Sequence, residues 1–196
     1  MRKRFLPASA LAILCISQQA VAAAWTIDPA HSVAAFTIKH MTVTTVPGAF
    51  GKVTGTIEWD EADITKSKVD ATIDATTVNT RNEQRDTHLK SPDFFDVAKF
   101  PTITFKSTKV EKAGDRLKVT GDLVMRGVTK AVVLDVEGPV APVGDARGNT
   151  KSGLSATTKI NRQDFGITWG SSLPGGGLVL GNDVTITIDL EIAKAK

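Results

Sequence analysis

The sequence predicts an all-β domain, and three features of the 196-residue chain support that prediction. Apolar and polar residues alternate with a period of two in one segment after another, as in strands with one buried face. Short turn-forming stretches, such as Lys112-Ala113-Gly114-Asp115 and Arg126-Gly127, separate these segments and favour antiparallel neighbours. Only residues 80–90 have a helical pattern. About eight strands can form a sandwich or a closed barrel, and a closed barrel of that size can hold one small ligand.

The predicted strands each place apolar residues at every second position. In chain order, the apolar faces are Ala34, Phe36, Ile38 and His40; Val53, Gly55, Ile57 and Trp59; Val69, Ala71, Ile73 and Ala75; Ile103 and Phe105; Leu117, Val119, Leu123 and Met125; Val132, Leu134 and Val136; Leu154, Ala156 and Ile160; and Val184, Ile186, Ile188, Leu190 and Ile192. Polar residues fill many of the alternate positions, which indicates one buried and one solvated face.

The helix predicted over residues 80–90 has a start signal and a stop signal. Thr80 and Glu83 have the spacing of a capping box. Ser91-Pro92 ends the helix, because the residue before a proline avoids the α region.

One face of this helix would be cationic, since Arg81, Arg85 and His88 are spaced i, i+4 and i+7. The simplest interpretation is a solvated face, with Asp86 and Lys90 forming an i,i+4 ion pair.

The N-terminal residues of the chain predict a segment separate from the folded domain. Residues 1–22 have the features of a secretory signal peptide: the basic start Met1-Arg2-Lys3-Arg4, a short apolar stretch, and small residues before a cleavage point after Ala22 or Ala24. The apolar stretch is shorter than the ~20 residues that span a bilayer. Residues 23–196 then form one domain, and we expect it to be exported.

Composition excludes several kinds of function for the exported domain. Removing residues 1–22 takes away three of the 24 Lys and Arg residues and none of the 21 Asp and Glu residues, which leaves 21 of each. A formal charge near zero gives no reason to expect nucleic acid as a partner. The only cysteine, Cys15, lies in the signal peptide, so disulfides, thiolate catalysis and cysteine-ligated metals are excluded.

The histidines do not predict a metal site or a catalytic site. His31 and His40 are nine residues apart on what reads as one strand, so they would point to opposite faces. No HxH or HExxH spacing is present. His88 and Ser91 lie close in sequence at a helix end, where nucleophile, base and orienting group do not line up. We expect no metal, no cofactor and no enzymatic activity; His40 is either a hydrogen-bonded core residue or a ligand contact.

Five stretches of the chain resemble one known family. They are WTIDPAHSVAAFTIKHM, RDTHLKSPDFFDVAKFPTITF, GDLVMRGVTKAVVL, INRQDFGI and the closing strand after GNDV, and together they resemble the YceI family from about Trp25 to the end. The resemblance implies an extended, eight-stranded, lipocalin-like antiparallel barrel with one short helix, near residues 80–90, beside its mouth. It also implies a periplasmic protein that holds a long hydrophobic molecule, such as a polyprenyl chain or a quinone tail. Two places depart from the family pattern: Lys130-Ala131 and residues 137–150.

The barrel that the resemblance implies gives a second interpretation of the helix, in which Arg85 and His88 lie at the mouth and bind a polar head group. Phe94, Phe95 and Phe100 would plug the barrel or line it. The segment SSLPGGGLVLG would be a mobile loop near the opening, with Trp169 and Leu178 as apolar contacts. The full set of predicted ligand-binding residues is Phe36, Ile38, His40, Phe50, Arg85, His88, Phe94, Phe95, Ile103, Phe105, Trp169 and Leu178.

Two functions follow from these expectations. The first is a non-enzymatic periplasmic carrier that sequesters a polyisoprenoid, quinone-like or other lipid, with modest specificity, because apolar walls discriminate chain lengths poorly. The alternative is an envelope stress or structural protein that acts through its surface, with the interior filled by side chains. The sequence leaves open a transient membrane contact and a homodimer.

Overall fold

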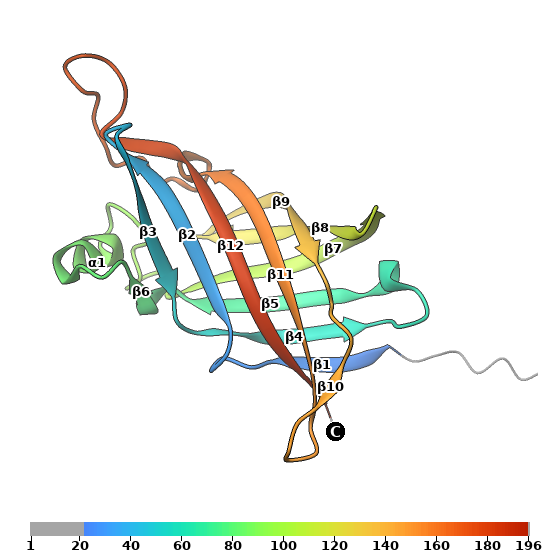
Figure 1. The fold of residues 1–196 in the computed structure, drawn as a ribbon. Helices are drawn as coiled ribbons and strands as arrows, with labels where there is room; N and C mark the ends of the chain where they lie inside the picture. Colours follow the sequence, from blue (N-terminus) through green and yellow to red (C-terminus); the bar gives the residue numbers. More distant parts are fainter. Residues whose placement is uncertain (1–21, 196) are drawn as a thin grey trace, which may run out of the picture.

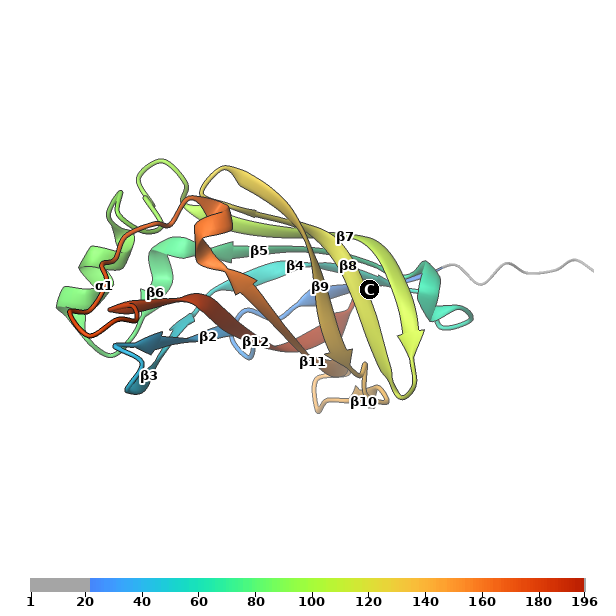
Figure 2. The same cartoon turned by 90° about the horizontal axis from the view of Figure 1, so that it is seen from above.

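Eight strands close into an antiparallel barrel in the computed structural model, which describes residues 22–195 (Figures 1 and 2). The predicted signal peptide, apart from Ala22, lies outside the described residues. The barrel strands are β1 (Ala23–Ile27), β4 (Val53–Trp59), β5 (Lys68–Asp74), β7 (Thr102–Ala113), β8 (Arg116–Met125), β9 (Val128–Glu137), β11 (Thr150–Asn161) and β12 (Leu180–Lys194). They pair in the order β1-β4-β5-β7-β8-β9-β11-β12, and β12 pairs with both β11 and β1, which closes the ring. The predicted fold class is confirmed.

Four further strands extend this ring. β2 (Val33–His40) follows β1 after a bend and pairs with β12, and β3 (Thr44–Phe50) pairs with β2 and leads into β4. β6 (Val78–Asn79) pairs with β3, and β10 (Val143–Gly144) folds the unusual segment 137–150 back onto β11. The sequence pattern identified β2 but missed β1 and β3.

The predicted apolar faces point into the barrel. All their residues except Gly55 and Ala75 line the interior cavity, and Ala75 is buried instead in the short 3₁₀ helix η2 (Ala75–Thr77). In β7 the inward positions change from odd, at Phe105, to even, at Val110, because the pairing with β8 shifts between Ser107 and Lys109. An extra residue at such a bulge reverses the alternation, so both side chains stay inside.

The single α-helix among the described residues is α1 (Glu83–Lys90). The predicted capping box is wrong: Asn82 is the N-cap, and its side chain accepts a hydrogen bond from Arg85 N at 2.9 Å. Thr80 is buried, and its hydroxyl donates to Asp86 at 2.6 Å. This bond also replaces the predicted Asp86–Lys90 pair, which is not formed. The helix ends as predicted, with Ser91 N donating to His88 O.

Two more 3₁₀ turns complete the fold, η1 (Ile64–Lys66) and η3 (Arg162–Phe165). Among residues 22–195, no helix has both the length and the apolar character needed to cross a bilayer.

Candidate ligand-binding site

The barrel encloses a cavity of about 630 Å³ with walls that are almost entirely apolar. That volume lies within the range of roughly 300–1,000 Å³ that is usual for small-molecule sites. Five consecutive inward residues of β12, from Val184 to Ile192, line the cavity. At ~3.3 Å per residue, the cavity is about 26 Å long beside this strand alone. A space of this shape suits a chain-like molecule better than a compact one.

The cavity reaches the surface beside α1. Asn82, Gln84 and Arg85 are exposed and also line the cavity, and His88 and Trp169 line it next to them. We call this end, defined by these five residues, the mouth. Many of the polar groups that face the cavity gather here, whereas the strands behind supply mainly aliphatic and aromatic side chains. A ligand with one polar end would therefore place that end at the mouth.

The structure places eleven of the twelve predicted ligand-binding residues on the cavity wall: Phe36, Ile38, His40, Phe50, Arg85, His88, Phe94, Phe95, Ile103, Phe105 and Trp169. Leu178 is the exception. It lies outside the lining, bridges to Ser172 in the loop before β12, and is 38 % exposed. Leu178 therefore does not line the cavity. That any of the twelve residues contacts a ligand stays a prediction.

Aromatic side chains form two contact groups around the mouth. Phe50 packs against Phe36 and Phe95, with ring centroids 5.6 and 5.3 Å apart. His88 packs edge-on against Phe94 and Trp169, with ring centroids 4.9 and 5.0 Å apart. The rings connect α1 and the loop after it to β2, β3 and the loop before β12.

Arg85 and His88 both face the mouth, whereas Arg81 does not line the cavity. Arg85 donates from Nε to the Thr80 hydroxyl at 2.7 Å and from a terminal nitrogen to the Thr80 carbonyl at 2.8 Å. Its guanidinium forms no ion pair within residues 22–195. His88 Nε2 lies 2.9 Å from an Asp93 carboxylate oxygen. Arg85 is thus held in place by neutral groups and keeps its charge available for a ligand.

Arg162 is a cavity-lining residue that the sequence analysis missed. Its side chain is buried, and it donates to the carbonyls of Gly181 and Ile167, each at 2.8 Å. These carbonyls lie at the two ends of the loop that carries Trp169, so one guanidinium group is hydrogen-bonded to both ends of the loop. Burial lowers the pKa of Arg162. The available signal was a basic residue directly after an apolar strand, within the INRQDFGI stretch.

Arg126 joins three of the sequence stretches that carry the family resemblance. It lies in the tight β8–β9 turn, where Arg126 and Gly127 both have positive φ angles of 52° and 73°. Its guanidinium donates to the carbonyl of Pro92, in the stretch after α1, and to the carbonyl of Gly166, at the end of η3. The most distinctive residues of the chain are therefore distant in sequence but adjacent at the mouth end.

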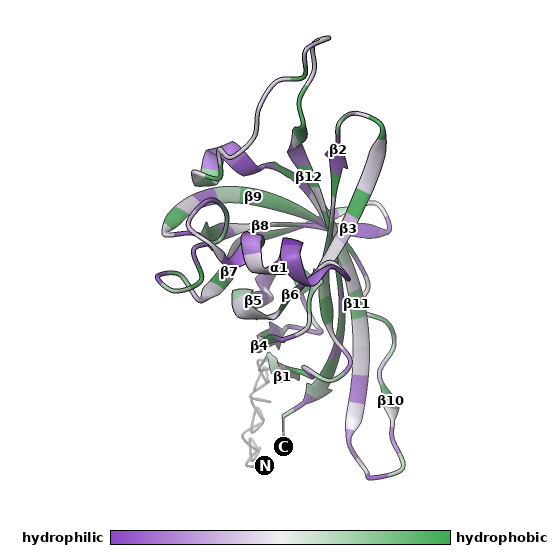
Figure 3. Ribbon diagram, turned by 90° about the vertical axis from the view of Figure 1, so that its left-hand side faces the viewer, coloured by the Kyte–Doolittle hydropathy of each residue, from purple (hydrophilic) through white to green (hydrophobic). Residues whose placement is uncertain are grey.

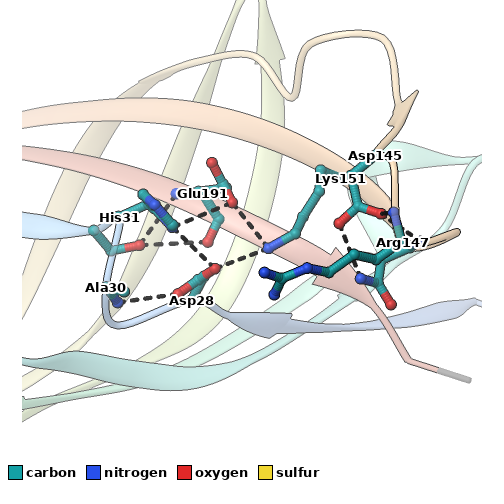
Figure 4. A network of polar contacts seen from close by, with 9 residues as sticks. Asp28, Ala30, His31, Asp145, Arg147, Lys151 and Glu191 are labelled. Carbon is teal, nitrogen blue, oxygen red and sulfur yellow. Dashed lines mark hydrogen bonds and ion pairs between the residues drawn. The ribbon is translucent and has the colours of Figure 1, made fainter.

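A second polar cluster lies away from the mouth, where the β1–β2 turn meets β11 and β12 (Figure 4). Contrary to prediction, His31 lies in this turn and not on one strand with His40. Asp28, His31 and Glu191 bring three potential metal ligands within 4.8 Å of one another. Lys151 Nζ lies 2.8 Å from Asp28 and 2.9 Å from Glu191, so one ammonium group already forms ion pairs with both carboxylates. Hydrogen bonds from Lys151 and His31 hold the pKa of Asp28 well below its ordinary value.

A closed antiparallel barrel with a long apolar interior and a mouth beside a helix is a lipocalin-like barrel. The family model described as a YceI-like domain matches residues 25–192. A UPF0312 protein of Staphylococcus aureus strain MSSA476 is 38 % identical over 169 residues, which covers 86 % of this chain and 96 % of that protein. The chain belongs to the YceI family.

Solved structures share the fold. The crystal structure of the Campylobacter jejuni YceI protein matches with a TM-score of 0.67 at 36 % identity, over 81 % of this chain and 90 % of that one. A polyisoprenoid binding domain from Saccharophagus degradans matches with a TM-score of 0.65 at 17 % identity, over 88 % of this chain and 99 % of that one. The second likeness shows a common fold only.

Proposed function

We propose that the protein binds one long hydrophobic molecule inside its barrel and carries or sequesters it in the periplasm without changing it chemically. The observation that supports this most directly is the long apolar cavity of about 630 Å³. Burying an apolar chain there removes it from water, at about 25 cal/mol per Å² of apolar surface. We propose a polyisoprenoid or quinone-type chain as the ligand; one solved structure with the same fold is described as a polyisoprenoid binding domain.

The polar end of such a ligand would lie at the mouth, against Arg85 and His88. An arginine can hold a phosphate with two parallel hydrogen bonds, and Arg85 has no carboxylate partner that would compete within the described residues. We expect the double substitution Arg85→Ala and His88→Ala to weaken geranylgeranyl phosphate binding by about tenfold or more, because hydrogen bonds to charged groups are worth ~1.5–3 kcal/mol. Geranylgeraniol, with the same chain and no charge, should lose much less. Titrations that show equal losses for the two ligands would return both residues to a structural role.

We propose that the chain is exported to the periplasm, because residues 1–22 have the features of a secretory signal peptide. Ala23 and Ala24 already pair with Trp59 and Glu58 of β4, so cleavage after Ala22 would leave β1 whole. Cleavage after Ala24 would remove two paired residues from the barrel wall. We therefore expect N-terminal sequencing of the protein from a periplasmic fraction to begin at Ala23. Recovery of the chain in the cytoplasm with residues 1–22 attached would contradict export.

A cavity-narrowing variant tests binding inside the barrel. Ala156 is buried in the middle of β11 and lines the cavity, so Ala156→Phe places a ring in the ligand's path. Diphenylhexatriene, which fluoresces in apolar surroundings, should bind the wild-type protein and bind this variant about tenfold more weakly or worse. Ala146→Phe is the matched control, because Ala146 is exposed in the loop after β10. Circular dichroism establishes that each variant is folded, and Ala71→Leu is a milder second variant on the cavity wall. Unchanged probe binding in both cavity variants would favour the alternative, a protein that acts through its surface.

A further inference from the structure

The mouth end of the barrel carries an exposed apolar surface of four residues, three of which lie outside the cavity wall. Met41, Val43, Trp169 and Leu178 are 42, 83, 40 and 38 % exposed, and we call these four residues the mouth patch. Three other large apolar residues are exposed among residues 22–195, Val133, Val140 and Val143, and they belong to β9 and to the segment around β10. A gathering of apolar groups around an opening is unusual for a surface that meets only water.

Two segments far apart in sequence build the mouth patch. The β2–β3 turn supplies Met41 and Val43, and the loop before β12 supplies Trp169 and Leu178. Met41 N donates to Val179 O at 2.8 Å, which joins the turn to the loop. Both lie at the end of the barrel where α1 lies, and Figure 3 looks onto this end, with hydrophilic α1 at the centre and the loop extending above it.

Neither segment contains a charged residue. Residues 41–51 and residues 167–182 lack Asp, Glu, Lys, Arg and His altogether, in a chain where 23 % of residues are charged. In the turn, Met41 and Thr42 have positive φ angles of 53° and 60°, which β-branched residues such as Thr rarely adopt. Val43 N donates to His40 O at 3.1 Å and closes the turn, and the Val43 side chain after it is 83 % exposed.

Positive charge flanks the mouth patch. Lys39, on the strand that leads into the turn, is exposed and lies against Gly181 at the end of the loop. Lys39 forms no ion pair with any residue in the range 22–195. An apolar patch bordered by an unpaired cation complements an anionic phospholipid surface, where the apolar groups enter the acyl boundary and the cation meets the head groups.

We propose that the mouth patch docks onto an anionic phospholipid bilayer, so that a long hydrophobic ligand passes between membrane and barrel without crossing water. The inference rests on the proposed function, because docking at the mouth matters only if a ligand enters there. The mouth then has two roles, in which Arg85 and His88 meet the ligand's polar end and the mouth patch meets the membrane.

Vesicle flotation tests the docking. The wild-type protein should float with phosphatidylcholine vesicles that contain phosphatidylglycerol, and less with phosphatidylcholine alone. Val43→Glu should reduce flotation by about tenfold, because the apolar side chain no longer leaves water and a charge must approach the acyl region. Val143→Glu is the matched control, since Val143 is 63 % exposed in β10, and it should float like the wild type. Lys39→Glu should remove the advantage of phosphatidylglycerol.

Three results would contradict docking of the mouth patch onto a bilayer. A wild-type protein that stays in solution with both kinds of vesicle, or a Val143→Glu variant that loses as much flotation as Val43→Glu, would overturn the docking. So would a wild-type dimer that Val43→Glu dissociates, because the mouth patch would then bind a second copy of the chain. Diphenylhexatriene binding measured without vesicles separates this inference from the proposed function. Val43→Glu, Val143→Glu and Lys39→Glu should each bind the probe as the wild type does. A wild-type protein that does not bind the probe would contradict the proposed function itself.

Discussion

At the scale of single residues, two glycines leave the space that two phenylalanine rings occupy inside the barrel. A Cβ atom at Gly121 would lie 2.4 Å from the Phe105 ring, and one at Gly48 would lie 2.3 Å from the Phe36 ring. Both rings line the cavity, so these two glycines determine how far the rings extend into it. The alternation of apolar residues predicts the rings but not the space beside them, because that space depends on which residues face each other across strands.

Gly121→Ala should therefore destabilise the protein. The added methyl group would also lie 2.5 Å from the Lys106 carbonyl, and backbone cannot move aside as a side chain can. Overpacking of this kind costs about 1–3 kcal/mol. Urea unfolding should show that loss for Gly121→Ala and almost none for Gly144→Ala, where nothing lies within 4 Å of the new atom. Equal midpoints for the two variants would contradict the packing described for Phe105.

The Asp28–Lys151 ion pair should make the free energy of unfolding depend on pH. Because the pKa of Asp28 in the folded protein is lowered from 3.8, its contribution to stability is complete at pH values above 3.8 and is lost as the pH falls below it. Lys151→Met should lower the free energy of unfolding at neutral pH, and the difference from wild type should shrink as the pH falls below 3.8. Lys159→Met, which removes an exposed pair with Asp183, should have little effect at either pH. If the difference in unfolding free energy between the wild type and Lys151→Met stays constant as the pH falls, the stabilisation by this pair is not ionic.

At the scale of elements, periodicity predicted most of the barrel. It identified seven of the ring strands, and the eighth position is filled by β1, which continues through a bend into the predicted β2. β3 was missed because Thr44, Thr45 and Pro47 interrupt the apolar pattern and proline is unusual inside a strand. The capping prediction failed because Arg81 adopts a positive φ angle of 62°, which delays the helix by two residues and makes Asn82 its cap.

The polar arrangement of the mouth could not be predicted in the same way. Arg85 and His88 were placed there because a family resemblance put the helix beside the opening. Arg162 and Arg126 were missed although both lie in stretches that carry the resemblance, because they bind backbone carbonyls such as those of Gly181 and Pro92, which local pattern does not bring together. Local pattern identifies elements, whereas contacts between loops depend on how the barrel closes.

Arg162→Met should loosen the loop that carries Trp169. The substitution leaves the carbonyls of Ile167 and Gly181 without their donor, and each unsatisfied buried group costs about 1–3 kcal/mol. We expect lower stability in urea and faster proteolytic cleavage within residues 168–180 than in the wild type. Arg116→Met, at an exposed ion pair with Glu137, provides the comparison. Cleavage at the same rate in both variants would show that Arg162 does not hold the loop.

At the scale of the whole molecule, a hydrophobic interior and a polar mouth occupy one continuous space. The eight-stranded ring supplies the apolar wall, and α1, η3 and the loop before β12 supply the polar and aromatic groups at one end. This division matches a molecule with a long apolar chain and one polar end. It also places the predicted helix, whose residues Arg85 and His88 line the cavity, at the polar end of that space.

The most direct test of the central claim is mass spectrometry of an organic-solvent extract of the protein purified from its native cells without detergent. The structure predicts a long-chain lipid, such as a polyisoprenoid or quinone, in stoichiometric amount and chemically intact after prolonged incubation. Ala156→Phe, which narrows the cavity, should yield far less of it. An extract of the folded wild-type protein that contains no such lipid, or equal amounts from both proteins, would contradict binding inside the barrel.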